Sequence, residues 1–388
     1  MSNVILKGNA SGTGTVTLES PNTNSDRTIS FPDSDGTVAF NNQLGMRNRI
    51  INGDMRIDQR NAGASVTITT DTQYTVDRWA GRTSAAASKF SVQQNAGSVT
   101  PPDGFKNYLG VTSLSSYSLG ASDYYTIQQH IEGYNIADLG FGTATAKTVT
   151  LSFWVRSSLT GTFGGSLINQ TFSRCYPFSY TISSANTWTQ ISITVAGETS
   201  GTWNTTNGHG LQVVFSLGMG STYSGTAGAW TSSTILAPTG ATSVVGTNGA
   251  TFYLTGVQLE VGSAATNFDF RSYGQELALC QRYYFKNAPT SIANSGLGAG
   301  FQSSTTNAVV YVSLPVTMRS TPTMVISNTL ISDNALYDAN VTLSTIYFTP
   351  TGGYVNLDSA SVGAQFRPCM WRTLSSGSIG YASYNAEL

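Results

Sequence analysis

The chain has 388 residues and a mass of 41.0 kDa, enough for two or three domains. Charged residues make up only 10% of it, against roughly 25% in an average soluble domain, and the formal net charge is −1. Because Lys and Arg are scattered rather than clustered, the sequence carries no basic field that would indicate a nucleic acid or an anionic membrane as a partner.

The residue types favour β-structure. Gly alone contributes 40 residues, and Ser and Thr are abundant throughout, a composition that suits short strands joined by tight turns. The three cysteines, Cys175, Cys280 and Cys369, are too few and too widely spaced for a disulfide framework or a zinc site. No apolar run approaches the roughly 20 residues that span a bilayer, and the N-terminus has no signal-peptide core. We therefore expect an all-β protein that is made in a reducing cytoplasm.

Residues 1–46 form a first predicted unit. Three short runs alternate apolar and polar residues, and turn-forming segments such as PDSDG connect them. Strands this short cannot bury a core alone, so we expect a β-meander that needs partners, most simply its own copies in other chains. The apolar positions are Val16 and Leu18, Ile29 and Phe31, and Val38 and Phe40.

Residues 47–271 form a longer predicted domain. Several runs place apolar side chains on one face, among them TVTLSFWVRSS, WTQISITVAG and LQVVFSLGMG. In TFYLTGVQLEVG the apolar phase changes at Thr255-Gly256, which is typical of a β-bulge. Many half-buried strands without intervening helices predict a β-sandwich.

Residues 272–287, SYGQELALCQRYYFKN, carry the clearest helical signal in the chain. Tyr273, Leu277, Cys280 and Tyr284 are spaced 4, 3 and 4 residues apart, which predicts one apolar stripe along a helix. Two interpretations stay open: a connector helix docked on its own sandwich, or a neck at which three chains associate. Residues 288–388 are again β-rich and predict a C-terminal β-sandwich tip, in which AVVYVSLPVTM would be an edge or bulged strand because it contains Pro315.

Catalytic patterns are scarce. We expect His130 and His209, the two histidines, to be surface or loop residues, and no nucleophile elbow, zinc-protease motif or Cys-His pair is present. We predict no catalytic residue, no metal ligand and no cofactor. Tyrosine is plentiful, at 19 residues, and an exposed ring with a hydroxyl edge suits the surface of a sugar. The candidate contacts are Tyr311, Trp371, Tyr381 and Tyr384; alternatively such tyrosines border subunit contacts.

Several segments together resemble phage tail fibre proteins, especially those of phages that infect marine bacteria and cyanobacteria. VILKGNASGTGTVTLESPNTNSDRTISFPDSDGTVA is similar to the start of such fibres. RNRIINGDMRIDQRNAG, YTVDRW, LSFWVRSSLTGTF and GVQLEVGSAATNFDFRSYGQELALCQRYY resemble their jelly-roll, carbohydrate-module-like domain. LPVTMRSTPTMV resembles an element of fibre tips.

The resemblance implies an elongated homotrimer in the virion tail, assembled in the cytoplasm of the host bacterium. It implies attachment to other tail proteins, which we assign to residues 1–46, and binding to a polysaccharide or lipopolysaccharide of the host surface during adsorption. We expect no enzymatic activity and no nucleic-acid partner. The alternatives are a tail-associated enzyme that degrades glycans and a secreted carbohydrate-binding module; the missing signal peptide weakens the second.

Overall fold

The computed structural model describes residues 46–84, 86–288, 295–333, 338–360, 364–374 and 380–388, which all fall within the unit Asn42–Leu388. The three strands predicted in the first 45 residues lie outside the described residues. The regular structure of the described residues is nearly all β-strand, as predicted, with a single α-helix among them.

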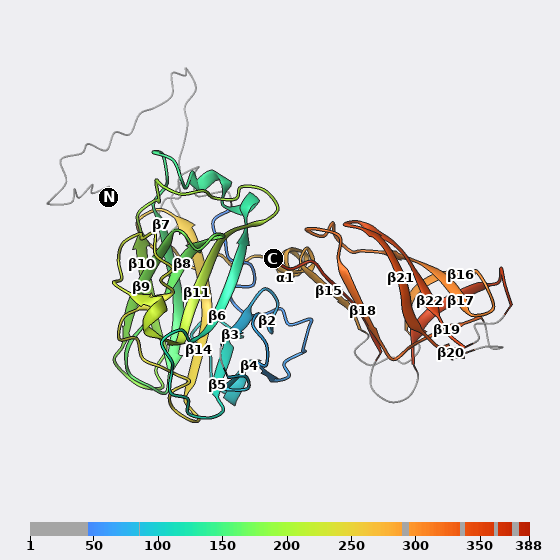
Figure 1. Cartoon of the computed structure of the whole chain (residues 1–388), viewed down its shortest axis with the longest axis horizontal. Coiled ribbons are helices and arrows are strands. Elements are labelled where there is room, and N and C mark those ends of the chain that lie inside the picture. The colour runs from blue at the N-terminus through green and yellow to red at the C-terminus, as the bar shows by residue number, and fades with distance from the viewer. Residues whose placement is uncertain (1–45, 85, 289–294, 334–337, 361–363, 375–379) are drawn as a thin grey trace, which may run out of the picture. The chain divides into compact units, whose positions relative to one another are not determined.

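The central domain is a sandwich of two six-stranded antiparallel sheets (Figure 1). The first sheet has the order β1 (Val66–Thr67), β4 (Phe90–Gln94), β5 (Leu109–Ser113), β14 (Thr251–Val261), β7 (Val149–Ser157), β10 (Thr189–Val195). The second has the order β2 (Gln73–Tyr74), β3 (Ala80–Thr83), β6 (Tyr124–Glu132), β11 (His209–Met219), β8 (Gly161–Asn169), β9 (Cys175–Ile182). The predicted strands of this region are therefore present.

Short elements complete the central sandwich. Two two-residue strands, β12 (Ser224–Gly225) and β13 (Ala237–Pro238), pair in parallel. Four 3-10 helices lie in its loops: η2 (Ala96–Ser98), η3 (Gly133–Asn135), η4 (Ala137–Leu139) and η5 (Ser221–Tyr223).

The core of the central sandwich follows the alternation of its strands. On β7, Val149, Leu151, Phe153 and Val155 all point inward and are at most 1% exposed. They meet aromatic and aliphatic side chains of the opposite sheet, such as Phe215, whose ring centroid lies 5.0 Å from that of Phe153. Because every second residue faces the core, the polar residues between them line the outer face.

The predicted bulge on β14 is confirmed. The pairing of β14 with β7 shifts between Thr255 and Gln258, and Gly256 has a φ of 62°. A side chain at Gly256 would meet the ring of Phe105 at 2.7 Å, so both its backbone conformation and its surroundings require glycine. The bulge restores the inward phase, because Leu254 and Val257 on either side of it are both buried.

The C-terminal region forms a second sandwich with its own core. Its seven-stranded sheet has the order β20 (Asp338–Asn340), β19 (Thr329–Ser332), β23 (Pro368–Thr373), β16 (Gly296–Gln302), β17 (Asn307–Ser313), β22 (Gly352–Asp358), β21 (Thr342–Thr349). Its three-stranded sheet has the order β15 (Tyr284–Asn287), β24 (Tyr381–Asn385), β18 (Thr323–Ser327). The prediction that one edge or bulged strand contains Pro315 is wrong. β17 ends at Ser313, because proline cannot donate a hydrogen bond to a β-ladder.

The helix is shorter than predicted. α1 spans Tyr273–Gln281, and Ser272 caps it by accepting a hydrogen bond from the main-chain N–H of Gln275. Residues Tyr284–Asn287 do not continue it but form β15, which pairs with β24. The β-propensity of the Tyr-Tyr-Phe run, satisfied by a partner strand distant in sequence, overrides the helical spacing of Tyr284.

Candidate functional site

Three tyrosines form a row on the outer face of the seven-stranded sheet. Tyr311, Tyr354 and Tyr347 lie directly opposite one another on β17, β22 and β21. The rings of Tyr347 and Tyr354 stack with centroids 4.7 Å apart, and those of Tyr354 and Tyr311 lie 6.0 Å apart. Tyr311 is 60% exposed and Tyr347 51% exposed. We call these three residues the tyrosine row.

The alternation of the three strands places the tyrosine row outside. Val310 and Val355, neighbours of Tyr311 and Tyr354 along the chain, are completely buried in the core of the C-terminal sandwich. Adjacent strands lie about 4.8 Å apart, so the three rings cover about 10 Å across the sheet. The packed inner face and the strand register fix the Cα positions from which the three rings project.

The surroundings of the tyrosine row are small, apolar or amide-bearing. Ala299 on β16 lies opposite Tyr311, and the exposed Met370 on β23 lies opposite Ala299, so one register line crosses five strands. On the same outward face, Asn356 follows Tyr354 by two residues and pairs with Thr345. Flat aromatic faces beside polar edges can stack on the apolar face of a sugar ring and hydrogen bond to its hydroxyls.

Of the four predicted sugar contacts, the structure places only Tyr311 in this row. Trp371 and Tyr384 cannot be contacts, because they are 0% and 1% exposed within the core of the C-terminal sandwich. Tyr384 lies on the central strand of its sheet and stacks on Phe285 with a centroid distance of 5.6 Å. Tyr381 is partly exposed, with the Lys286 ammonium 4.7 Å from its ring centroid.

Two members of the row were not among the predicted contacts. Tyr347 and Tyr354 occur in STIYFTP and GYVNLDS, both predicted as alternating strands. In each run the tyrosine alternates with apolar residues, Ile346 and Phe348 in the first and Val355 and Leu357 in the second, which was the available signal that its ring points outward. What the sequence did not show is that β21 and β22 pair with Tyr347 opposite Tyr354.

The predicted stripe on the helix divides between two environments. Tyr273 is 61% exposed, whereas Cys280 is fully buried beside Ile51 and Ile57 of the central domain. Leu277 is partly buried against the same cluster. Within the chain the helix therefore packs on residues of the central domain. Association of three chains through α1 stays a prediction.

Replacing Leu277 with Asp is expected to lower the free energy of unfolding by about 1.5–3 kcal/mol, because a charged group replaces a leucine packed beside Ile51 and Cys280. Thermal denaturation measures this loss. If the unfolding transition is unchanged and the mass from light scattering falls from trimer to monomer, the helix acts instead as the neck.

The two histidines lie on strands and are only partly exposed, so the expectation of surface or loop residues holds only in part. His130 on β6 and His209 on β11 stack with ring centroids 4.4 Å apart, and burial lowers the pKa of His130 to about 3 and that of His209 to about 4. His130 faces outward from its sheet, and an outward-facing position is expected to be exposed to solvent. Segment 386–388 covers this position, and the main-chain oxygen of Leu388 lies 3.1 Å from Nδ1 of His130.

Other kinds of site are not indicated in the described part of the chain. No group of three or more His, Cys, Asp or Glu side chains there is placed to hold a metal ion. Within those same residues, no helix is long and apolar enough to cross a membrane.

No family model and no curated protein matches this chain. Solved structures resemble parts of it. The enzymatically active domain of tailspike protein 4 of bacteriophage CBA120 has a TM-score of 0.31 and 11% identity over 55% of this chain and 21% of that one. The family 11 carbohydrate-binding module of the cellulase Lic26A-Cel5E of Clostridium thermocellum has a TM-score of 0.26 and 10% identity over 53% and 99% of the two chains.

A third structure covers more of the chain. The N-terminal CBM22-1–CBM22-2 tandem domain of Xyn10C from Paenibacillus barcinonensis has a TM-score of 0.26 and 11% identity, over 84% of this chain and 99% of that one. The aligned part is about a fifth of the tailspike structure but nearly the whole of both carbohydrate-binding structures. The chain thus resembles, in part, carbohydrate-binding modules and a phage tailspike domain.

Proposed function

We propose that this chain is a non-enzymatic phage tail fibre protein that binds a glycan of the host cell surface through the tyrosine row. The observation that carries the glycan-binding part is the row itself: three rings in register across adjacent strands, two of them more than half exposed. Contiguous exposed apolar surface on a soluble protein often marks a contact with a ligand or a partner.

The sequence resemblance to tail fibres supports the biological setting. In this proposal the chain is a homotrimer in the virion tail, residues 1–46 hold it to other tail proteins, and the glycan is a polysaccharide or lipopolysaccharide. The C-terminal sandwich supplies the contact surface, since the tyrosine row lies on its seven-stranded sheet.

The test is binding of purified protein to host lipopolysaccharide and capsule, measured by biolayer interferometry. The double variant Tyr311→Ala/Tyr347→Ala is expected to raise Kd about 10- to 100-fold, because each ring contributes about 0.5–1.5 kcal/mol of stacking. The matched control is Tyr134→Ala, which removes a ring that is 59% exposed on η3 of the central sandwich. If the double variant and the control bind equally well, the tyrosine row is not the glycan-binding site.

The same samples distinguish binding from catalysis. Reducing-end assays and mass spectrometry on the incubated polysaccharide are expected to show no released oligosaccharide. Reproducible release that disappears when the protein is denatured would identify the chain as a glycan-degrading enzyme instead.

A further inference from the structure

A cavity of about 480 Å³ lies in the central domain, away from the strands of the tyrosine row. The segment that leads into the sandwich, the loop before α1 and the first turns of α1 form its walls. Its volume is within the range of small-molecule sites, roughly 300–1,000 Å³. The lining residues that bear on its chemistry are Arg49, Asn135, Asp269, Phe270, Ser272 and Gln275.

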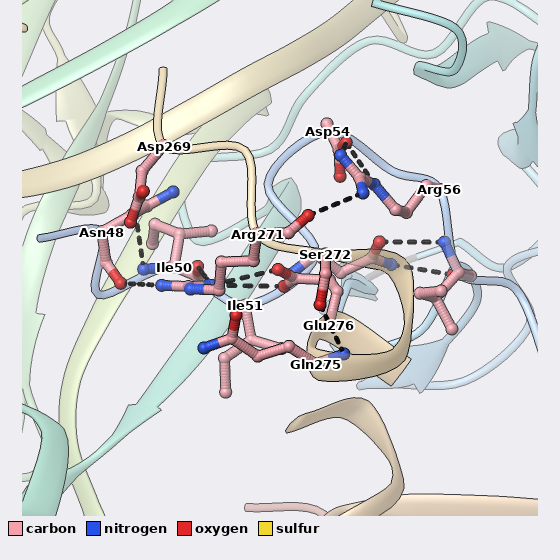
Figure 2. A network of polar contacts seen from close by, with 12 residues as sticks. Asn48, Ile50, Ile51, Asp54, Arg56, Asp269, Arg271, Ser272, Gln275 and Glu276 are labelled. Carbon is pink, nitrogen blue, oxygen red and sulfur yellow. Dashed lines mark hydrogen bonds and ion pairs between the residues drawn. The ribbon is translucent and has the colours of Figure 1, made fainter. Parts of the chain in front are cut away.

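The walls of the cavity are fixed by a network of polar contacts. Figure 2 shows Arg271 reaching the main-chain oxygens of Asn48 and Ile50 and the carboxylate of Glu276. Glu276, which is 4% exposed, also accepts a hydrogen bond from the main-chain N–H of Asn52 at 2.5 Å. The lead-in segment, the loop and the helix are thereby tied together, so their side chains are preorganised around the cavity.

The charges around the cavity are balanced within the protein. Arg49 forms a bidentate pair with Asp138, at 2.6 and 2.8 Å, and Arg271 is paired with Glu276. Oδ1 of Asp269 lies 3.3 Å from the Arg47 guanidinium. Neither arginine of the lining is left to neutralise an anion, which favours a ligand without charge.

One wall is a supported aromatic ring. Phe270 is 49% exposed, and its ring packs against those of Phe105 and Phe268 with centroid distances of 5.2 and 4.8 Å. An exposed phenyl ring that two further rings hold in place offers a flat apolar face at little cost in conformational entropy.

Polar groups with unused hydrogen-bonding capacity lie near this ring. In the described part of the chain the side-chain amides of Asn135 and Gln275 have no hydrogen-bond partner, and the hydroxyl of Ser272 only accepts, from Gln275 N–H. Oδ2 of Asp269 is also unengaged, while the main-chain N–H of Asp269 is held by Gln258 at 2.8 Å. Two amides and a carboxylate can together donate to and accept from neighbouring hydroxyl groups.

We propose that this cavity binds one neutral pyranose residue, as a second carbohydrate site separate from the tyrosine row. The apolar face of the sugar would stack on Phe270, and its hydroxyls would bond to Asp269, Gln275 and Asn135. A sugar acid is excluded from the same position because its carboxylate would approach that of Asp269 without a free cation beside it. The proposal shares only its ligand class with the proposed function.

A fluorescent label beside the cavity reports binding at this site and not at the tyrosine row. Tyr273→Cys places a thiol at a position that is 61% exposed and next to the lining residue Ser272. Cys175, Cys280 and Cys369 are buried, and burial raises the pKa of the Cys175 and Cys369 thiols to about 11, so an alkylating, environment-sensitive dye should label only the new cysteine.

The probes are the methyl glycosides of glucose, galactose, mannose and N-acetylglucosamine, with methyl glucuronide as the charged comparison. At least one neutral probe is expected to give a saturable change of fluorescence, with affinity at least tenfold above that of the glucuronide. Gln275→Ala and Phe270→Ala in the labelled protein should each weaken it about tenfold; Gln275 is exposed, so its replacement keeps the fold.

Two results would overturn the site: no saturable change with any neutral probe, or a titration curve that Gln275→Ala leaves unaltered. The variant Tyr311→Ala/Tyr347→Ala, carrying the same label, should give the same titration curve as the labelled protein with an intact tyrosine row. Loss of polysaccharide binding by that variant tests the proposed function independently, so each proposal can fail without the other.

Discussion

Replacing Glu387 with Gln is expected to lower the free energy of unfolding by about 3–5 kcal/mol, the cost of leaving a buried charge without its partner. The carboxylate of Glu387 is 4% exposed and pairs with two arginines at once. Arg60 lies 3.0 Å away, and Arg78, only 1% exposed, contacts the other oxygen. Both arginines precede the main strands of the central sandwich, whereas Glu387 follows β24 of the C-terminal one.

Among the described residues, Arg60 and Arg78 form ion pairs with no carboxylate other than that of Glu387. The Arg78 guanidinium lies over the ring of Tyr283 at 3.6 Å, and that of Arg60 over the ring of Tyr284 at the same distance. Burial lowers the pKa of Arg60, which shows that its charge is already disfavoured where it lies. A neutral amide at position 387 would remove the ion-pair partner of both guanidinium groups and leave the Asp77 carboxylate as the strongest electrostatic partner of Arg60.

Calorimetry of Glu387→Gln measures the effect as a fall of roughly 4–7 °C in the transition temperature. The matched control is Asp71→Asn, which breaks the pair of Arg82 with a carboxylate that is 50% exposed, and should cost less than about 1 kcal/mol. If the two variants lose equal stability, the Glu387 carboxylate does not hold the arginines in solution.

Acidification from about pH 7.5 to 4.5 should destabilise the protein through His130 and His209. Their folded pKa values, about 3 and about 4, lie below the value of about 6.5 in an unfolded chain. Between these values the unfolded state binds protons that the folded state does not, so stability is fully present above pH 6.5 and falls as the pH decreases. The expected loss is about 2–5 kcal/mol for the pair.

The hydrogen bonds of His130 explain why the folded state rejects the proton. Nδ1 faces the main-chain oxygen of Leu388 at 3.1 Å and must donate, so Nε2 accepts from the amide of Gln128 at 3.2 Å. The oxygen of that amide accepts from Gln212, which fixes its orientation. A proton on Nε2 would point at an N–H group, and the charge would also face His209.

The double variant His130→Gln/His209→Gln isolates this contribution. Urea denaturation at several pH values should show a shallower loss of stability in the variant than in the parent protein. Asp77 acts in the opposite direction, because burial raises its pKa to about 6 and its ionised form is destabilising, but it is present in both proteins. Parallel curves for the two proteins would show that the histidines do not set the acid limit.

Much of the fold follows from local pattern. The alternation in β7 and β11, and the change of phase at Gly256, each depend on residues within one strand, so the sequence alone predicts them. What it could not supply is the pairing between distant strands. Residues 284–287 become a strand only because β24, nearly a hundred residues later, lies beside them.

The same limit explains only some of the errors at the candidate site. Trp371 is buried because it lies on the inward face of β23 with Cys369, and Gly298 on the paired β16 leaves room beside the indole. His130 is enclosed because segment 386–388 covers an outward position of β6. The enclosure of His130 depends on a long-range contact that periodicity does not encode. The inward direction of Trp371 and the outward direction of Tyr311 follow the phase of their own strands.

The exposure of the tyrosine row has a consequence for evolution. Its side chains take no part in the buried core beneath, formed by residues such as Val310 and Val355, and surface substitutions usually change stability by less than about 0.5 kcal/mol. Mutation can therefore replace the rings one at a time while the sandwich survives each step. In the proposed function, a changing host surface would concentrate divergence among descendants of this protein on one face of one sheet, and a few substitutions would shift host range.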